Sequence, residues 1–209
     1  MKGKLSTLFG AEVPNYMFKP TPDVSLRLLW LGGRRGLTWR QTSDEGFSQD
    51  PMKIRTGIAS ELGRLREVRN SSAQAGCQFV YSREQLTVWL DRPLPEKMLE
   101  LVNLGHVLVA EEEHEIVGYG ALDAGNYEVE AIFVLPSYTG QGVGRALLGA
   151  LESLAEGLNL VNLQLSASLN AVSFYRDAGY VPSGRGKLAL NDSLALEYES
   201  MEKNLGAAV

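Results

Sequence analysis

The sequence has few of the features that mark secreted, membrane-spanning or nucleic-acid-binding proteins. Its single cysteine, Cys77, excludes an internal disulfide framework and fits a reducing cytosol. No apolar run approaches the roughly 18–20 residues that span a bilayer, and the first twenty residues lack the apolar core of a secretory signal. A net charge of −5 argues against a nucleic-acid-binding chain. We therefore expect a cytoplasmic protein whose partners include neither nucleic acid nor a membrane.

Several well-known catalytic and nucleotide-binding signatures are also missing. The glycines that follow residues 131–135 are spaced G-x-G-x-G, which is neither the Rossmann fingerprint nor a P-loop. The motifs that accompany a kinase glycine loop are absent. His106 and His114 have no neighbours at metal-ligand spacing, so we expect no metal centre. Ser166 and Ser168 lack the G-x-S-x-G elbow of a serine hydrolase.

Length and charge patterning predict one domain behind a basic extension. The chain has 209 residues and an ordinary hydrophobic content of 44%. Residues 1–42 hold seven basic and two acidic side chains, and residues 44–51 resemble a polar linker. We expect residues 1–51 to be a poorly ordered basic extension and linker. The alternatives are a docking arm or a targeting segment, and the latter would place the protein in an organelle stroma or matrix.

From Met52 onward the hydrophobic periodicity becomes regular and alternates between the two secondary-structure types. Ser60 is positioned to cap a helix, Ser82 to Gln85 form a capping box, and Pro95 suits the first position of another helix. The pattern predicts strands at 53–56, 106–110, 116–122, 127–135, 161–166 and 193–203, and helices after Ser60 and at 84–90, 96–101 and 146–158. This order predicts an α/β domain with a mixed sheet.

The most informative segment is residues 136–148, P-S-Y-T-G-Q-G-V-G-R-A-L-L, which joins a strand to a helix. Gly140, Gly142 and Gly144 allow a sharp turn and a close approach of the backbone to a ligand. A turn at the start of a helix presents free N–H groups at the positive end of the helix dipole. The segment therefore predicts a cradle for a phosphate or pyrophosphate.

This segment resembles the acetyl-CoA signature of the GCN5-related N-acetyltransferase (GNAT) superfamily, [QR]-x-x-G-x-[GA]. Thr139 stands where the family usually has Gln or Arg, a position that contacts pyrophosphate largely through its backbone. A second stretch resembles the family pattern N-x-x-x-x-F-Y-x-x-x-G-[FY], and its matching residues are Asn170, Phe174, Tyr175, Gly179 and Tyr180. The resemblance covers residues 52–205. It implies a GNAT-type, mostly antiparallel sheet with flanking helices and a splay between the central strands.

The resemblance also implies acetyl-CoA as co-substrate and a set of residues that bind it. The central strand would bind the pantetheine and thioester through unpaired amides, the glycine loop would bind the pyrophosphate, and Asn170 would bond the pantetheine arm. Arg145 suits either a phosphate contact or a solvated first helical turn. The implied binding residues are Ile132, Phe133, Val134, Thr139, Gly140, Gln141, Gly142, Val143, Gly144, Arg145, Asn170 and Phe174.

Acetyl transfer to an amine requires the neutral amine, and deprotonating an alkylamine at pH 7 costs about 4.6 kcal/mol. A carboxylate supplies the general base. Strand alternation predicts that Glu128 and Glu130 share one face with Ile132 and Val134. Glu128 has the offset used by histone-type relatives, whereas Glu130 lies closer to the expected acetyl group and is slightly favoured. Both carboxylates facing solvent is the alternative.

The resemblance assigns Tyr175 as the acid that protonates the departing thiolate. We therefore expect an acetyl-CoA-dependent N-acetyltransferase acting on a primary amine of a small molecule or a peptide. A catalytically silent acyl-CoA-binding regulatory module is the alternative. Dimers are frequent in the family, so a homodimer is the expected assembly if the chain associates.

Overall fold

The computed structural model describes residues 52–206, and the predicted basic extension at 1–51 lies outside the described residues. The elements follow one another as β1 (Lys53–Thr56), η1 (Ala59–Glu61), α1 (Leu62–Gly76), α2 (Arg83–Asp91), α3 (Lys97–Asn103), β2 (Val107–Glu112), β3 (Glu115–Asp123), β4 (Glu128–Val134), η2 (Pro136–Tyr138), α4 (Val143–Gly157), β5 (Asn162–Ser168), α5 (Val172–Asp177), β6 (Val181–Ala189) and β7 (Ala195–Asn204). None of the helices in residues 52–206 has the length and apolar character needed to cross a membrane.

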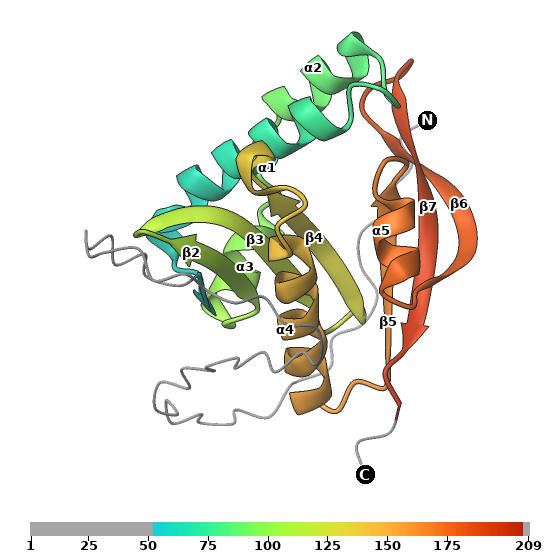
Figure 1. Cartoon of the computed structure of the whole chain (residues 1–209). Coiled ribbons are helices and arrows are strands. Elements are labelled where there is room, and N and C mark those ends of the chain that lie inside the picture. The colour runs from blue at the N-terminus through green and yellow to red at the C-terminus, as the bar shows by residue number, and fades with distance from the viewer. Residues whose placement is uncertain (1–51, 207–209) are drawn as a thin grey trace, which may run out of the picture. The chain divides into compact units, whose positions relative to one another are not determined.

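The seven strands form one sheet in the order β1-β2-β3-β4-β5-β7-β6. All neighbouring pairs are antiparallel except β4 and β5, which are parallel and meet only at Glu128 and Gln164. Beyond that single pair the two central strands diverge, as the ribbon shows between β4 and β5 (Figure 1). The mixed, mostly antiparallel sheet and the central splay were both predicted, and both are confirmed.

Helices cover both faces of the sheet because their apolar positions recur at helical spacing. On α4, the buried residues are Val143, Leu147, Leu148, Leu151 and Ala155. Helix α4 packs with α5 on one face of the sheet, and α1 and α3 pack on the other face through residues such as Leu65 and Met98. The splay is thus flanked by helices on each side.

Two predicted helix starts are wrong and one is confirmed. Ser60 lies inside η1 and caps nothing; instead, the Glu61 carboxylate accepts a hydrogen bond from the Ile58 N–H at 2.9 Å. Helix α3 begins at Lys97 with Glu96 as its N-cap, so Pro95 precedes the helix, and its carbonyl accepts a hydrogen bond from Met98 N–H at 2.9 Å. The capping box of α2 forms as predicted, with Gln85 N–H donating to Ser82 Oγ at 3.1 Å.

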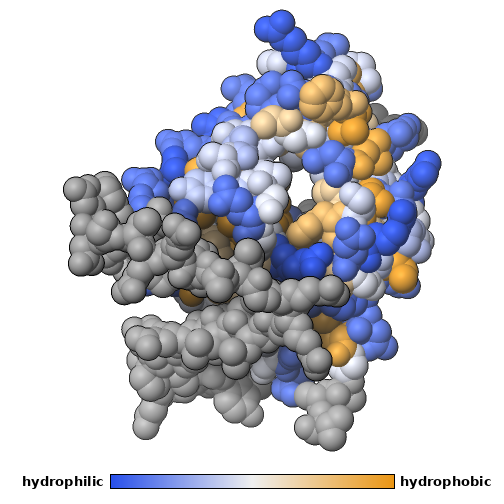
Figure 2. All heavy atoms as spheres, in the orientation of Figure 1, coloured by the Kyte–Doolittle hydropathy of each residue, from blue (hydrophilic) through white to orange (hydrophobic). Residues whose placement is uncertain are grey.

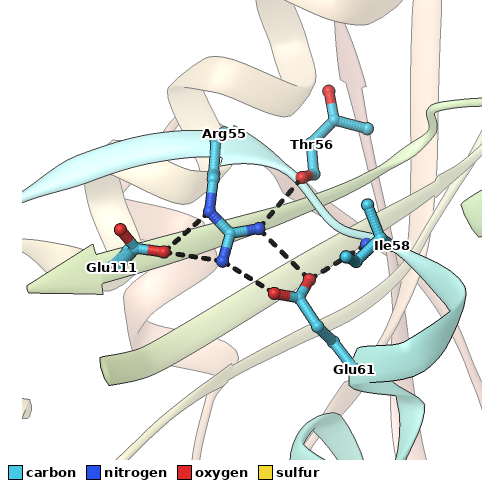
Figure 3. Close-up of polar contacts among 5 residues, drawn as sticks. All are labelled: Arg55, Thr56, Ile58, Glu61 and Glu111. Atoms are coloured by element: carbon cyan, nitrogen blue, oxygen red, sulfur yellow. Dashed lines mark hydrogen bonds and ion pairs between the residues drawn. The ribbon is translucent and has the colours of Figure 1, made fainter. Parts of the chain in front are cut away.

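An arginine ties the first strand to its surroundings (Figure 3). Arg55 Nε donates to Glu111 on β2 at 2.7 Å, and its Nη2 donates to Glu61 at 2.7 Å. Hydrogen bonding from Arg55 lowers the pKa of Glu61 despite partial burial. The cluster fixes β1 and the entry of α1 at the edge of the sheet.

Candidate functional site

Strand β4 contains a bulge at its acidic end. Ala131 pairs with Ala121 of β3, and Val129 pairs with Leu122, so Glu130 is the extra residue between two pairs. A bulge of this kind interrupts the alternation of side chains between the faces of a strand. The side-chain directions before and after Glu130 therefore follow different registers.

The predicted sharing of one face by Glu128, Glu130, Ile132 and Val134 is wrong for this reason. Ile132 and Val134 pack on the α4 side, against Leu151 and Leu147 respectively. The two glutamates remain on the opposite side, where Lys97 of α3 contacts Glu130. The regular alternation of side chains along a strand therefore cannot predict the face of these residues, because the bulge inserts one extra residue, Glu130.

The backbone of β4 presents polar groups to the splay. Leu135 N–H donates to Val117 O of β3 at 2.8 Å. Because successive residues of a strand direct their N–H groups to opposite edges, Phe133 also faces β3, whereas Ile132 and Val134 face the gap toward β5. No strand partner in residues 52–206 pairs with β4 there, since β5 meets β4 only at Glu128. Of the three predicted main-chain positions, Ile132 and Val134 are thus available.

The glycine loop has the conformation that its sequence requires. Gly140 and Gly142 have φ of 80° and 87°, in the left-handed region that favours glycine, and Gly142 is the N-cap of α4. The first helical N–H groups, from Val143 to Arg145, precede the first intrahelical donor, Ala146. The loop and the helix start therefore offer unpaired main-chain donors, the arrangement that binds phosphate.

Other predicted residues of the loop are open to solvent or serve the loop itself. Thr139, Gln141 and Arg145 are exposed, and Gln141 Nε2 donates to Ser137 O at 2.7 Å. Arg145 forms no ion pair with any described residue. The Val143 side chain is buried in the core, so only its backbone is available.

Two predicted residues of the second motif lie near the ends of helices. The Phe174 ring lies against Gly144, where an added Cβ would be 3.5 Å away. Asn170 Oδ1 accepts a hydrogen bond from the Cys77 thiol at 3.2 Å, at the C-terminus of α1. Burial raises the pKa of Cys77 to about 11, so the thiol stays protonated and acts as a packed donor rather than a nucleophile.

A cleft of about 490 Å³ opens where β4 and β5 diverge. Glu128, Glu130 and Phe133 of β4 line it, and Tyr175 of α5 lines it from the β5 side. The space-filling view shows an opening in the molecule, with both hydrophilic and hydrophobic residues around it (Figure 2). The structure therefore brings together the three predicted catalytic side chains in one cleft.

Only one of the two glutamates that line this cleft forms an ion pair among the described residues. Lys97 contacts both Asp123 and Glu130, the latter at 3.4 Å. Glu128 forms no ion pair within the described part of the chain. Burial, and then the charge of Glu130, raise the pKa of Glu128 above its ordinary value. Of the two carboxylates that line the cleft, Glu128 is therefore the one without an ion pair among the described residues.

Tyr175 is buried between two aromatic rings. Its ring centroid lies 4.9 Å from that of Phe174 and 5.8 Å from that of Tyr180, both in edge-on arrangements. Burial raises the pKa of Tyr175, so its phenol remains protonated at neutral pH. The protonated hydroxyl is therefore held at the wall of the cleft.

Sequence reasoning missed most of the residues that line the rest of the cleft. They come from α1, α2, β3 and β7, and the main ones are Arg69, Trp89, Tyr119 and Tyr198. No motif or periodicity links them, because they are far apart in the chain and converge only through the fold. Three of the four, Trp89, Tyr119 and Tyr198, are aromatic, and that is the one signal these three share.

A splayed central sheet, a glycine loop at a helix start, and two glutamates with a tyrosine in the gap are the features expected of an acyl-CoA-using class of protein. The acetyltransferase (GNAT) domain model matches residues 77–190. An uncharacterised protein of Mycobacterium leprae is 31% identical over 180 residues, which cover 81% of this chain and 43% of that protein. The chain thus spans less than half the length of this curated relative.

Solved structures show the same fold. A GCN5-related N-acetyltransferase from Rhodopseudomonas palustris is 25% identical with a TM-score of 0.66, covering 77% of this chain and 99% of that one. PaiA N-acetyltransferase from Thermoplasma acidophilum, in complex with coenzyme A, is 22% identical with a TM-score of 0.61, covering 74% and 99%. A phosphinothricin acetyltransferase from Sinorhizobium meliloti, in complex with acetyl-CoA, is 21% identical with a TM-score of 0.55, covering 74% and 89%.

This chain belongs to the GNAT acetyltransferase family. The predicted resemblance is confirmed over more than half of the chain. Members of the family use acetyl-CoA as co-substrate and act on amine-bearing substrates.

Proposed function

We propose that this protein is an N-acetyltransferase that moves an acetyl group from acetyl-CoA to a primary amine by direct attack. One observation carries the proposal: Glu128 and Tyr175 line the same cleft, and that cleft opens at the splay between β4 and β5. The free donors of the glycine loop, at the start of α4, support binding of the coenzyme A pyrophosphate. The acetyl end of the cofactor would then enter the splay.

In the proposed reaction, Glu128 removes a proton from the ammonium of the acceptor, directly or through water. The neutral nitrogen attacks the thioester carbon, and main-chain N–H groups of Ile132 and Val134 stabilise the developing charge on the carbonyl oxygen. The carbon–sulfur bond then breaks. Tyr175 donates its phenolic proton to the departing sulfur, which leaves as free coenzyme A. The nitrogen loses its second proton, which returns through water to the Tyr175 phenolate, and Glu128 releases its proton to solvent.

We prefer Glu128 to Glu130 as the base, whereas the sequence alone slightly favoured Glu130. Glu130 is already paired with Lys97, whose ammonium lies 3.4 Å from its carboxylate. Glu128 has no such partner among residues 52–206, and its pKa is raised toward the range that suits a general base. Glu130 and Lys97 would then position the acceptor and tune Glu128.

The direct test measures release of free thiol when the full chain is incubated with acetyl-CoA and a panel of primary amines. We expect thiol release that depends on an amine and falls in the Glu128→Gln variant but not in Glu115→Gln, an exposed glutamate on β3 outside the cleft. If calorimetry shows tight binding of acetyl-CoA while no amine releases thiol, the chain is instead a silent acyl-CoA-binding module. Cytoplasmic location and a homodimer remain predictions.

A further inference from the structure

The cleft concentrates aromatic side chains. Six of the eleven aromatic residues between positions 52 and 206 line it, and they are Tyr81, Trp89, Tyr119, Phe133, Tyr175 and Tyr198. They come from α2, β3, β4, α5, β7 and the loop before α2. Two of them are already accounted for. Tyr175 belongs to the proposed reaction, and the Tyr81 hydroxyl donates a hydrogen bond to Glu197 O at 2.6 Å. The remaining four form the walls.

Three of these four side chains, Trp89, Phe133 and Tyr119, form a continuous aromatic surface. The ring centroids of Trp89 and Phe133 lie 6.5 Å apart, and those of Tyr119 and Phe133 lie 5.6 Å apart. Trp89 and Phe133 are only half-buried, so part of each ring faces the open cleft. A flat apolar ligand would cover this surface and gain both buried area and ring–ring contact.

At the buried end of this surface lies a hydroxyl without a partner. Tyr119 is fully buried, and its Oη makes no hydrogen bond with any described residue. A buried polar group in this state costs free energy that a ligand donor or acceptor would recover. The neighbouring Arg69 guanidinium does not supply the bond, since it donates to backbone oxygens such as Arg92 O at 2.6 Å.

The charge of the cleft favours an acceptor with a single ammonium group. Glu128 and Glu130 are the carboxylates that line it, and Lys97 already pairs with Glu130. Two arginines, Arg69 and Arg92, also line it. A polyamine or an aminoglycoside, with several ammonium groups, would meet one unpaired carboxylate and two cations.

We propose that the acceptor is an arylalkylamine that carries a hydrogen-bonding group on its ring. Its ring lies against Trp89 and Phe133, the ring substituent bonds the Tyr119 hydroxyl, and its amine reaches Glu128. This inference rests on the proposed function and narrows its acceptor. The cleft, at about 490 Å³, is within the size range of small-molecule sites.

The experiment compares four amines in the thiol-release assay of the full chain: tyramine, 2-phenylethylamine, n-hexylamine and spermidine. We expect kcat/KM for 2-phenylethylamine to exceed that for hexylamine and spermidine about tenfold, from ring contacts. Tyramine should exceed 2-phenylethylamine by about fivefold or more, from the bond to Tyr119. Equal or higher kcat/KM for spermidine or hexylamine would overturn the proposal while leaving the acetyltransferase function intact.

Two variants with matched controls test the assigned contacts. Trp89→Leu should abolish the preference for aryl over alkyl amines, whereas Phe79→Leu, at a ring that is 87% exposed, should keep it. Tyr119→Phe should abolish the preference for tyramine over 2-phenylethylamine. Tyr180→Phe, at a buried tyrosine outside the cleft, should keep it. A Trp89→Leu variant that slows all four amines by the same factor contradicts the ring contact.

A binding measurement separates this inference from the proposed function. Calorimetry on the chain saturated with coenzyme A reports acceptor affinity without any turnover. Tyramine should bind at least about tenfold more tightly than spermidine, and Trp89→Leu should remove the difference. If tyramine binds more tightly than spermidine but no amine is acetylated, the proposed acetyltransferase function is wrong, whereas the arylalkylamine remains the ligand. If spermidine binds more tightly, the ligand class is wrong.

Discussion

The ammonium of Lys97 on α3 lies 3.4 Å from the carboxylate of Glu130, the residue that bulges from β4. The same ammonium also contacts Asp123 at the end of β3. One cation thus serves two carboxylates, and the third acidic side chain nearby, Glu128, is left without an ion pair within residues 52–206. Two glutamates that are two positions apart in the chain therefore have different electrostatic surroundings.

Replacing the two glutamates separately should distinguish their roles. Glu128→Gln should lower kcat by about 10²–10⁴-fold because it removes the base, at amine concentrations that saturate the wild type. Glu130→Gln should lower kcat less, with the larger effect on the KM of the acceptor. Steady-state kinetics at pH 7 measure both. A larger loss of kcat in Glu130→Gln would assign the base to Glu130.

The pH dependence should follow the charges around Glu128. The base works when deprotonated, so kcat/KM should rise with pH through the pKa of Glu128, which burial and Glu130 raise and Lys97 lowers. Lys97→Met removes the lowering charge, and the acidic limb of the profile should move to higher pH. Lys187→Met, which breaks an exposed pair with Glu197, should leave the limb in place. A shift to lower pH in Lys97→Met contradicts this account.

Tyr175→Phe tests the proton donor. The phenol is buried and its pKa is raised, so it is protonated throughout the working range of pH and can supply a proton to sulfur. Removing the hydroxyl should lower kcat by about 10²-fold, while the Kd for acetyl-CoA measured by calorimetry stays within about twofold because the ring remains. Unchanged turnover would remove Tyr175 from the reaction.

Gly142, at the start of α4, and Gly149, within α4, are a test variant and its control for cofactor binding by the glycine loop. Gly142→Ala places a Cβ at φ of 87°, which should lower the free energy of unfolding by about 1 kcal/mol and weaken acetyl-CoA binding. Gly149→Ala, in the interior of α4 with no atom within 4 Å of the new Cβ, should stabilise by about 0.5–1 kcal/mol. Chemical denaturation and calorimetry measure the two effects. Equal cofactor affinity in both variants would place the cofactor elsewhere.

A glycine on the edge strand controls one wall of the cleft. Gly186 pairs directly with Tyr198, and a Cβ at Gly186 would overlap the Tyr198 ring. Gly186→Ala should therefore displace that ring, lower the free energy of unfolding by about 1–3 kcal/mol and raise the acceptor KM. Gly184→Ala, on the same strand in open space, should do neither. Thermal unfolding and kinetics with acetyl-CoA held at saturation measure both variants, and identical behaviour would contradict the assigned contact.

Local patterns predicted the elements well and the side-chain directions in β4 poorly. The Ser82 capping box and the apolar stripe of α4 depend on residues within one or two turns, so the sequence determines them almost alone. The Glu130 bulge depends on how β3 aligns with β4, which counting along one strand cannot reveal. Because of this bulge, Ile132 and Val134 lie on the α4 face of the sheet rather than on the face of the glutamates.

The sequence by itself determined the glycine loop and the presence of Tyr175 and two glutamates, because backbone conformation and chemistry are local properties of those residues. Only the tertiary structure decided which glutamate is paired, since Lys97 reaches Glu130 from a separate helix. It also decided that Trp89, Tyr119 and Tyr198 share one cleft. Contacts between distant segments depend on how the sheet splays and how the helices pack on it, and no spacing in the chain encodes that directly.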